Sequence, residues 1–284
     1  MGESMSSVTL SEGTYVGYDG TEMFMCTWHP EGRPRAVILA LHGLGAHSGL
    51  LSFVAKYYAE NGFKVYVPDL RGFGHYSGLK GHVESFDEYT KDIDVLVTNI
   101  MSEHPELKLF LHGHSLGPLF AIRYSLAHPG VFDGYVLPCP AVSERLEINP
   151  VVKGLLRFLA VLNVKKQFSN GLNYDYIARN PEVVERNRTD PLRWDKVTPR
   201  FAVEGFKARE HAFNSAEEMT DPVIILQTGN DKILVPEMNR DFYERIGSED
   251  KTWRFYEDLY HEPWEDEGGE VMLEEMVKWI EARI

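Results

Sequence analysis

The sequence of 284 residues predicts an α/β fold built on a mostly parallel sheet. Short apolar runs alternate along the chain with helical patterns, the order typical of parallel strands joined by helices. Several runs are apolar throughout, as expected for strands buried on both faces. This alternation of strand and helix patterns stops at about residue 141 and resumes after residue 215, which indicates a helical insertion between two strands. We therefore expect a core of residues 1–140 and 216–284 and an inserted cap of residues 141–215.

Eight strands account for this sheet. Residues 8–30 alternate in the manner of two antiparallel strands around a turn at Tyr18-Asp19-Gly20. Six shorter runs follow, at residues 36–41, 64–69, 107–114, 132–137, 223–226 and 253–256. Helical patterns lie near residues 50–61, 86–102, 120–127, 237–246 and 270–283.

Composition and charge exclude several classes of protein. A formal net charge of −14 argues against a general nucleic-acid-binding protein, which needs a basic face. No run approaches the roughly 18 apolar residues of a membrane span, and Met1–Ser6, which we expect to be flexible and polar, lacks the layout of a signal peptide. Two cysteines, Cys26 and Cys139, offer no disulfide framework. These features favour a cytoplasmic protein.

The most informative stretch runs from Leu109 to Gly117. A strand pattern leads into Gly113-x-Ser115-x-Gly117, and a helical pattern follows, which is the setting of a nucleophile elbow. The flanking glycines permit a strained turn that lifts the Ser115 hydroxyl above the strand end. A serine hydroxyl is a poor nucleophile at neutral pH, so it needs a base that is oriented by an acid.

Candidates for the acid and the base follow two late strands. Catalytic groups gather at the carboxyl ends of strands in open parallel sheets. Asp231 follows the run 223–226, and His261 follows the run 253–256. Asp231 could instead be a turn residue, and His261, one of eleven histidines, could be structural. Asp221 precedes its strand and would lie at the wrong end of the sheet.

Two backbone amides are candidates for an oxyanion hole. Leu116 directly follows the nucleophile, and Leu44 lies in a glycine-rich loop after the run 36–41. His112 and His114 have the spacing of a metal-binding pair, but no third and fourth ligands follow at suitable spacing. We therefore expect no metal ion at this pair.

Together these residues make the chain resemble the monoacylglycerol lipase and lysophospholipase-like branch of the α/β-hydrolases, over about residues 12–282. The chain order Ser115, Asp231, His261 is the order of that fold. The resemblance implies an eight-stranded, mostly parallel sheet with helices on both faces and a helical cap inserted after the sixth strand. It also implies hydrolysis of a lipid-like ester by a serine nucleophile without a cofactor. The matching landmarks are residues 42–49, 69–78, 113–117, 189–192, 229–231 and 260–262.

Four positions depart from this resemblance. Ala46 stands where the family often has an acidic residue and Leu50 where it has an arginine, two groups that help shape the glycerol headgroup region. Their loss weakens the expectation of a strict monoacylglycerol preference. Phe73 replaces a usual histidine and Pro118 a common glycine, and proline is tolerated in the first turn of a helix.

The most apolar part of the cap is Val151–Val164, which carries a stripe of apolar residues at helical spacing. The charged residues between positions 150 and 166 are all basic: Lys153, Arg157, Lys165 and Lys166. One interpretation is a lid that lines an acyl pocket and makes transient contact with a lipid surface. The other is a helix that packs its stripe on the core. The first makes Leu155, Leu159 and Leu162 candidates for substrate binding. His114, which flanks the elbow, is a further candidate.

We therefore predict a serine carboxylester hydrolase that cleaves monoacylglycerols or similar single-chain lipid esters through an acyl-enzyme at Ser115. An aminopeptidase or a carbon–carbon hydrolase with the same three residues remains an alternative, because one fold hosts many chemistries. A non-catalytic binder of an apolar ligand is another. We expect Cys139 to be a buried structural thiol, with a position near the site as the alternative.

Overall fold

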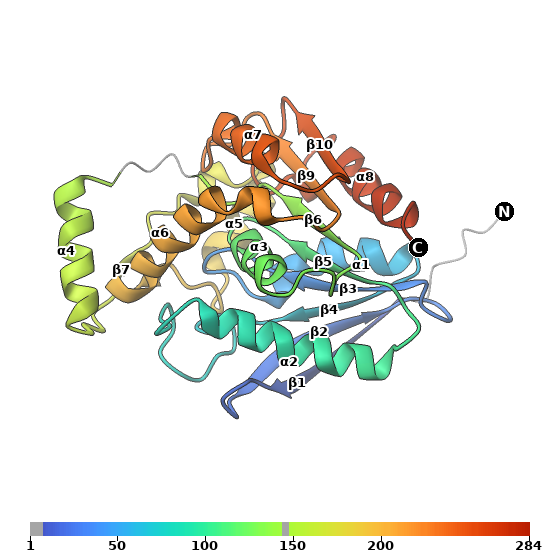
Figure 1. The fold of residues 1–284 in the computed structure, drawn as a ribbon, viewed down its shortest axis with the longest axis horizontal. Helices are drawn as coiled ribbons and strands as arrows, with labels where there is room; N and C mark the ends of the chain where they lie inside the picture. Colours follow the sequence, from blue (N-terminus) through green and yellow to red (C-terminus); the bar gives the residue numbers. More distant parts are fainter. Residues whose placement is uncertain (1–7, 144–147) are drawn as a thin grey trace.

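The computed structural model describes residues 8–143 and 148–284, so the prediction for Met1–Ser6 lies outside the described residues. Its sheet has eight strands in the order β1-β2-β4-β3-β5-β6-β9-β10 (Figure 1). The pairs β1–β2 and β2–β4 are antiparallel and the other pairs are parallel. The strands are β1 Thr9–Val16, β2 Glu22–His29, β3 Ala36–Leu41, β4 Phe63–Pro68, β5 Leu109–Gly113, β6 Gly134–Pro138, β9 Val223–Thr228 and β10 Lys251–Tyr256. The predicted fold class and mostly parallel sheet are confirmed.

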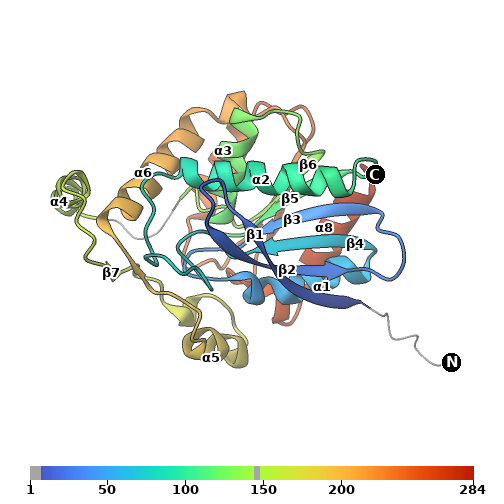
Figure 2. The ribbon, with the colours of Figure 1, turned by 90° about the horizontal axis from the view of Figure 1, so that it is seen from below.

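Helices cover both faces of this sheet (Figure 2). Apolar side chains of α2, α3, α6 and α7 form one core layer with the sheet, and those of α1 and α8 form the other. The helices are α1 Ser52–Glu60, α2 Asp87–Glu103, α3 Gly117–Ala127, α4 Pro150–Val161, α5 Pro181–Thr189, α6 Pro199–Asn214, α7 Pro236–Arg245 and α8 Glu270–Glu281. Short 3-10 turns lie at Ser48–Leu51, Tyr174–Tyr176, Ala216–Glu218 and Pro263–Glu265.

The predicted strands agree with the observed ones within about two residues. Every residue of β3, β4, β5, β6 and β9 is buried, which explains why these strands read as continuous apolar runs. The edge strand β10 begins two residues before the predicted run, and none of its residues is fully buried. An edge strand carries a weaker apolar signal because one of its sides has no neighbouring strand.

The segment between β6 and β9 contains α4, α5 and α6, as the predicted insertion requires, and also two short paired strands. Strands β7 (Phe168–Ser169) and β8 (Lys196–Val197) pair antiparallel. A strand of two residues is too short to show periodicity, so neither strand could be predicted from the sequence. The Asn-Pro pairs at 149–150 and 180–181 begin α4 and α5, because each asparagine side chain accepts a hydrogen bond from the backbone amide two residues later.

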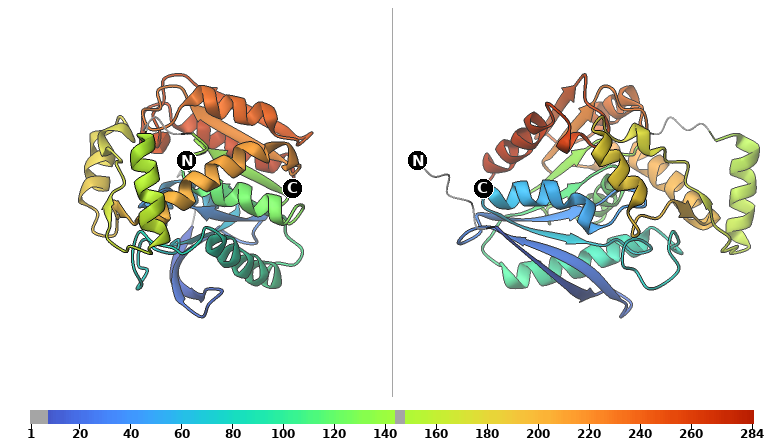
Figure 3. Two further views of the ribbon diagram at one scale, coloured as in Figure 1. Left: turned by 60° about the vertical axis from the view of Figure 1, so that its left-hand side comes forward. Right: turned by 180° about the vertical axis from the view of Figure 1, so that it is seen from behind.

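Helix α4 projects from the body of the molecule (Figures 1 and 3). Leu156 and Ala160 pack on Val203 of α6, so only a narrow strip of the predicted stripe is covered. Six large apolar side chains on or just after α4 are exposed: Val151, Val152, Leu155, Phe158, Val161 and Leu162. Within residues 8–143 and 148–284, no helix combines the length and the apolar character that crossing a membrane requires.

Candidate active site

Ser115 sits in a sharp turn between β5 and α3, with a backbone φ of 59°, a value rare for a residue with a side chain. The flanking glycines make this turn possible. A Cβ on Gly113 would lie 2.9 Å from the carbonyl carbon of Gly117, and a Cβ on Gly117 would lie 2.6 Å from the Leu41 carbonyl oxygen. The turn therefore needs glycine at both positions to present the hydroxyl at the end of the sheet.

Ser115, His261 and Asp231 come together at the carboxyl ends of β5, β10 and β9. The Ser115 Oγ lies 2.9 Å from His261 Nε2, and His261 Nδ1 lies 2.8 Å from Asp231 Oδ2. A carboxylate only accepts, so Nδ1–H donates to Asp231 and leaves Nε2 to accept from the Ser115 hydroxyl. The arrangement can remove a proton from Ser115 as it attacks a carbonyl carbon.

Asp231 is held as an anion by its surroundings. Its Oδ1 accepts hydrogen bonds from the amides of Ile233 (2.8 Å) and Leu234 (2.9 Å), which leaves Oδ2 for the imidazole. Burial raises the pKa of Asp231, but the His261 imidazole and the two amides outweigh burial and lower this pKa to about 2. The carboxylate therefore keeps a negative charge beside His261 at neutral pH.

His261 is buried, and two opposing effects act on its pKa. Burial lowers the pKa, but the charge and the hydrogen bond of Asp231 outweigh burial and raise it well above its ordinary value of 6.5. His114 positions this residue from behind, because its Nε2 donates to the His261 carbonyl oxygen at 3.1 Å. His114 was predicted to contact substrate, but it does not line the cavity at Ser115, and the structure places its ring against the backbone of His261.

Leu44 and Leu116, whose amides are the predicted oxyanion donors, line the same cavity as Ser115. Neither amide donates a hydrogen bond to any acceptor in the part of the chain that the structure describes. The loop of Leu44 is fixed by His42, whose Nε2 accepts from the Leu70 amide at 2.9 Å. Burial lowers the pKa of His42 to about 4, so its ring stays neutral and can accept. These two amides can stabilise a negative oxygen beside Ser115.

The cavity above Ser115 has a volume of about 270 Å³ and a mixed lining. Its apolar side chains are Leu44, Leu116, Leu172, Ile177, Ile233 and Leu234. Its polar side chains are Asn170, Asn173, Tyr176, Arg193, Arg209, Lys232 and Glu262. An apolar surface with a few polar groups is typical of a site for a small amphipathic molecule.

Three predicted substrate contacts lie elsewhere. Leu155, Leu159 and Leu162 belong to the α4 region and do not line this cavity. Leu155 is 54% exposed and Leu162 is 59% exposed. The structure therefore does not bring these three side chains to the cavity at Ser115. Helical periodicity identifies an apolar face, but it does not say what that face contacts.

The cap residues that do line the cavity were not found from the sequence. Most of them come from the irregular segment 170–177, which has neither helical nor strand periodicity. Arg193 directly follows the 189–192 landmark, and that adjacency was the one available signal. Asp190 of the landmark ties the cap to the Leu44 loop, because its Oδ2 lies 2.9 Å from His47 Nε2.

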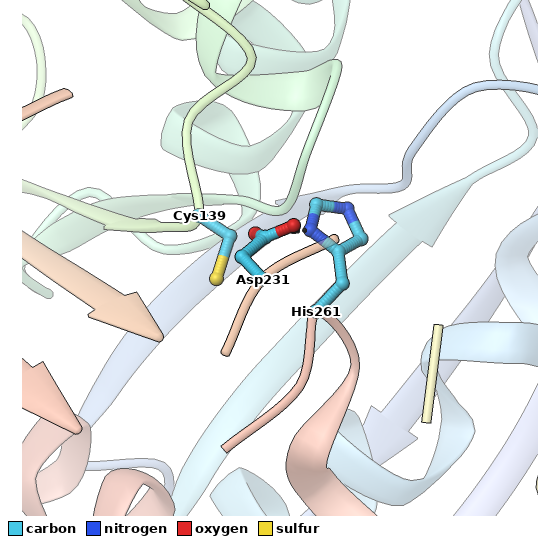
Figure 4. Close-up of side chains that lie close together, drawn as sticks. All are labelled: Cys139, Asp231 and His261. Atoms are coloured by element: carbon cyan, nitrogen blue, oxygen red, sulfur yellow. Dashed lines mark hydrogen bonds and ion pairs between the residues drawn. The ribbon is translucent and has the colours of Figure 1, made fainter. Parts of the chain in front are cut away.

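Cys139 lies beside the acid and the base (Figure 4). It is a buried free thiol with a φ of 46°, and its Sγ lies 3.4 Å from the Thr228 hydroxyl. Among the described residues, Cys139, Asp231 and His261 form the one group with metal-ligand atoms within 4.8 Å of one another. Because Asp231 and His261 already share a hydrogen bond, we assign them to acid–base chemistry. Both alternatives for Cys139 hold, since it is buried and near the site.

Comparisons with known proteins agree with this geometry. A family model described as serine aminopeptidase, S33, matches residues 32–268. The crystal structure of a Paleococcus ferrophilus monoacylglycerol lipase is 32% identical, covers 93% of this chain and 100% of that chain, and superposes with a TM-score of 0.84.

Two curated relatives cover almost all of this chain. A monoacylglycerol lipase of Mycolicibacterium smegmatis is 28% identical over 281 residues, which are 99% of this chain and 100% of that protein. An uncharacterised abhydrolase domain-containing protein of Dictyostelium discoideum is 29% identical over 98% of this chain, but the chain spans only 30% of that protein. The chain therefore belongs to the α/β-hydrolase family described as serine aminopeptidase, S33, and is a monoacylglycerol lipase-like member of it, of the lipase and esterase type.

Proposed function

We propose that this protein is a serine carboxylester hydrolase that cleaves monoacylglycerols or similar single-chain lipid esters. The observation that carries the proposal is the unbroken hydrogen-bonded line from the Ser115 hydroxyl through His261 to Asp231, at 2.9 and 2.8 Å. The partly apolar cavity at Ser115 supports an amphipathic substrate. The names of the Paleococcus and Mycolicibacterium relatives support the monoacylglycerol class.

The geometry gives each group a role in two half-reactions. Ser115 Oγ attacks the ester carbonyl while His261 Nε2 takes its proton, and the oxyanion receives hydrogen bonds from the amides of Leu44 and Leu116. The intermediate collapses, and His261 returns the proton to the departing alcohol. Water then attacks the acyl-enzyme with His261 again as base, which releases the fatty acid and restores Ser115. Asp231 orients the ring and stabilises its positive charge.

An aminopeptidase is the second candidate, favoured by the description of the family model. A free peptide N-terminus carries a positive charge and needs an acidic partner. Among the residues that the structure describes, the charged side chains that line the cavity include one acidic residue, Glu262, and the basic residues Arg193 and Lys232. This excess of positive charge favours a neutral or anionic substrate over a peptide with a free N-terminus.

The exposed apolar side chains of α4 support contact with a lipid surface. Val151 is 79% exposed and Val161 is 78% exposed, and the charged residues of the helix, Lys153 and Arg157, are basic. A helix of this composition can lie in the interface of a membrane without crossing it. We propose that α4 makes this contact transiently in the cytoplasm, where the buried thiols of Cys26 and Cys139 would stay reduced.

The experiment that tests the proposal compares wild type with Ser115→Ala on monoacylglycerols of graded chain length, lysophospholipids, diacylglycerols and aminoacyl anilides. We expect ester hydrolysis by the wild type and a loss of at least about 10⁴-fold in kcat for Ser115→Ala. Labelling by a fluorophosphonate should disappear in the same variant. Ser102→Ala, which changes an exposed serine on α2, is the matched control. Full activity of Ser115→Ala, or anilides as the better substrates, would contradict the proposal.

A further inference from the structure

Arg193 is a buried cation in the wall of the cavity that contains Ser115 and His261. Its side chain is only 3% exposed. Its Nε and Nη1 atoms are buried and have no hydrogen-bond partner in the described residues. A buried guanidinium is costly unless its N–H groups meet acceptors, so this arrangement points to a ligand that supplies them.

The neighbours of Arg193 orient its guanidinium but do not supply acceptors for all of its N–H groups. The nearest carboxylate oxygen is Glu262 Oε1, 4.0 Å from Nη2, which is beyond hydrogen-bond distance. The guanidinium carbon lies 5.0 Å from the ring centroid of Tyr174, a cation–π contact. A planar fork of N–H donors matches the paired oxygens of a phosphate or a carboxylate.

The backbone around Arg193 is tied to the loop that carries Leu44. The Trp194 amide donates to the Gly45 carbonyl oxygen at 2.8 Å, and Asp190 Oδ2 lies 2.9 Å from His47 Nε2. Asp190 also accepts from the Leu192 amide at 2.8 Å, which shapes the turn before Arg193. These hydrogen bonds hold the turn that carries Arg193, so its backbone needs little reorganisation when a ligand binds.

The position of Arg193 indicates which part of a substrate it meets. Glu262, its nearest carboxylate, directly follows His261, the residue that would return a proton to the departing alcohol. Among the described residues, Lys232 is a further cation in the lining of this cavity, in a protein with a net charge of −14. A locally positive cavity in an acidic protein attracts an anionic ligand.

We propose that Arg193 binds an anionic oxygen group, a phosphate or a carboxylate, on the alcohol part of the ester, so that anionic single-chain esters are the preferred substrates. This inference rests on the proposed esterase function and narrows it. Arg193 is a specificity residue here and takes no part in proton transfer.

The test uses short esters that stay monomeric, so that the charge of lipid aggregates does not affect the result. It measures kcat/KM for 1-hexanoylglycerol, for its 3-phosphate and for O-hexanoyl glycolate, which carry no charge, a phosphate and a carboxylate. We expect the wild type to prefer an anionic ester by about 10-fold or more. Arg193→Met should lose about 10- to 100-fold on that ester and less than about 3-fold on the neutral one.

Two further variants make the result specific. Arg193→Lys keeps the charge without the fork and should lie between wild type and Arg193→Met. Arg254→Met removes an exposed arginine on β10 and should keep the wild-type preference. Fluorophosphonate labelling checks that each variant retains a competent Ser115. A wild type without preference, or an Arg193→Met that loses the same factor on both classes, would overturn the proposal.

A binding measurement separates this inference from the proposed function. In the Ser115→Ala background, calorimetry measures the Kd of the intact anionic and neutral esters. Arg193→Met should weaken binding of the anionic ester by about 10-fold or more and leave the neutral ester unchanged. Absence of labelling and turnover in the wild type would refute the esterase, while unselective binding would refute the role of Arg193.

Discussion

Replacement of Asp231 by asparagine tests the hydrogen-bonded line in the site with almost no change in side-chain size. Asp231 Oδ1 accepts from the amides of Ile233 and Leu234, so the asparagine oxygen is held at that position. The asparagine NH₂ group then faces His261 Nδ1 and donates to it. His261 must carry its proton on Nε2, and it no longer accepts the proton of Ser115.

The size of the effect follows from the lost charge and the wrong tautomer. A unit charge about 4 Å from the imidazolium contributes about 4 kcal/mol at an effective dielectric constant of about 20, which corresponds to roughly 10³-fold in rate. The tautomer adds to this loss. We therefore expect kcat/KM of Asp231→Asn to fall by about 10³- to 10⁴-fold. Because Asp231 raises the pKa of His261, its removal should also move the acid limb of the pH profile to lower pH.

The assay is hydrolysis of a soluble p-nitrophenyl ester between pH 5 and 9, with Asp221→Asn as the matched control. Asp221 lies at the other end of the sheet and accepts from the Ser125 hydroxyl at 2.6 Å and the Gly130 amide at 2.7 Å. That variant should lose stability but keep the kcat of its folded fraction. The reasoning fails if Asp231→Asn keeps more than about a tenth of kcat/KM with an unchanged acid limb.

Three further predictions concern the loop, the cap and the pH dependence of stability. Gly45→Ala should destabilise the fold and slow ester hydrolysis, because φ is +69° and a Cβ would lie 2.3 Å from the Trp194 carbonyl oxygen; wild-type melting and kcat would contradict this. The double variant Val151→Ser/Val161→Ser should partition onto phospholipid vesicles about 10-fold less in a flotation assay, with hydrolysis of soluble esters unchanged. The free energy of unfolding should fall by about 3.5 kcal/mol between pH 6 and 5, because the unfolded chain takes up protons that three buried histidines do not. Urea midpoints that do not change over this range would refute that slope. Burial lowers the pKa values of these histidines, to about 4 for His42, about 3 for His112 and about 4 for His114.

The parts of the molecule that the sequence predicts are those whose signal is local. Strands buried on both faces read as apolar runs, and the elbow at Ser115 needs glycines that are visible in the sequence. Asp231 and His261 could be placed because each follows such a run, and the parallel pairing of β9 and β10 brings their carboxyl ends together. The topology of the sheet therefore brings residues together that are far apart in the sequence, which no local pattern could show.

The parts that the sequence did not predict depend on contacts between distant segments. His114 was read as a substrate contact because it adjoins the nucleophile, but its ring donates to the His261 carbonyl oxygen, 147 positions later in the chain. Side chains of segment 170–177 line the cavity, but the segment is irregular and has no helical or strand periodicity from which this could be predicted. Amphipathicity predicts that Leu155 and Leu159 lie on an apolar face of a helix, but it does not predict what that face contacts.

The cap consists of two parts that make different contacts. The part around Arg193 and segment 170–177 lines the cavity and is tied to the Leu44 loop by the Asp190–His47 pair and the Trp194–Gly45 hydrogen bond. The part formed by α4 packs on α6 and turns its apolar residues outward. Because the cavity wall is tied to the Leu44 loop, which we propose as part of the oxyanion hole, changes in α4 need not disturb the site. Substrate selection and contact with a lipid surface can therefore vary independently in this cap.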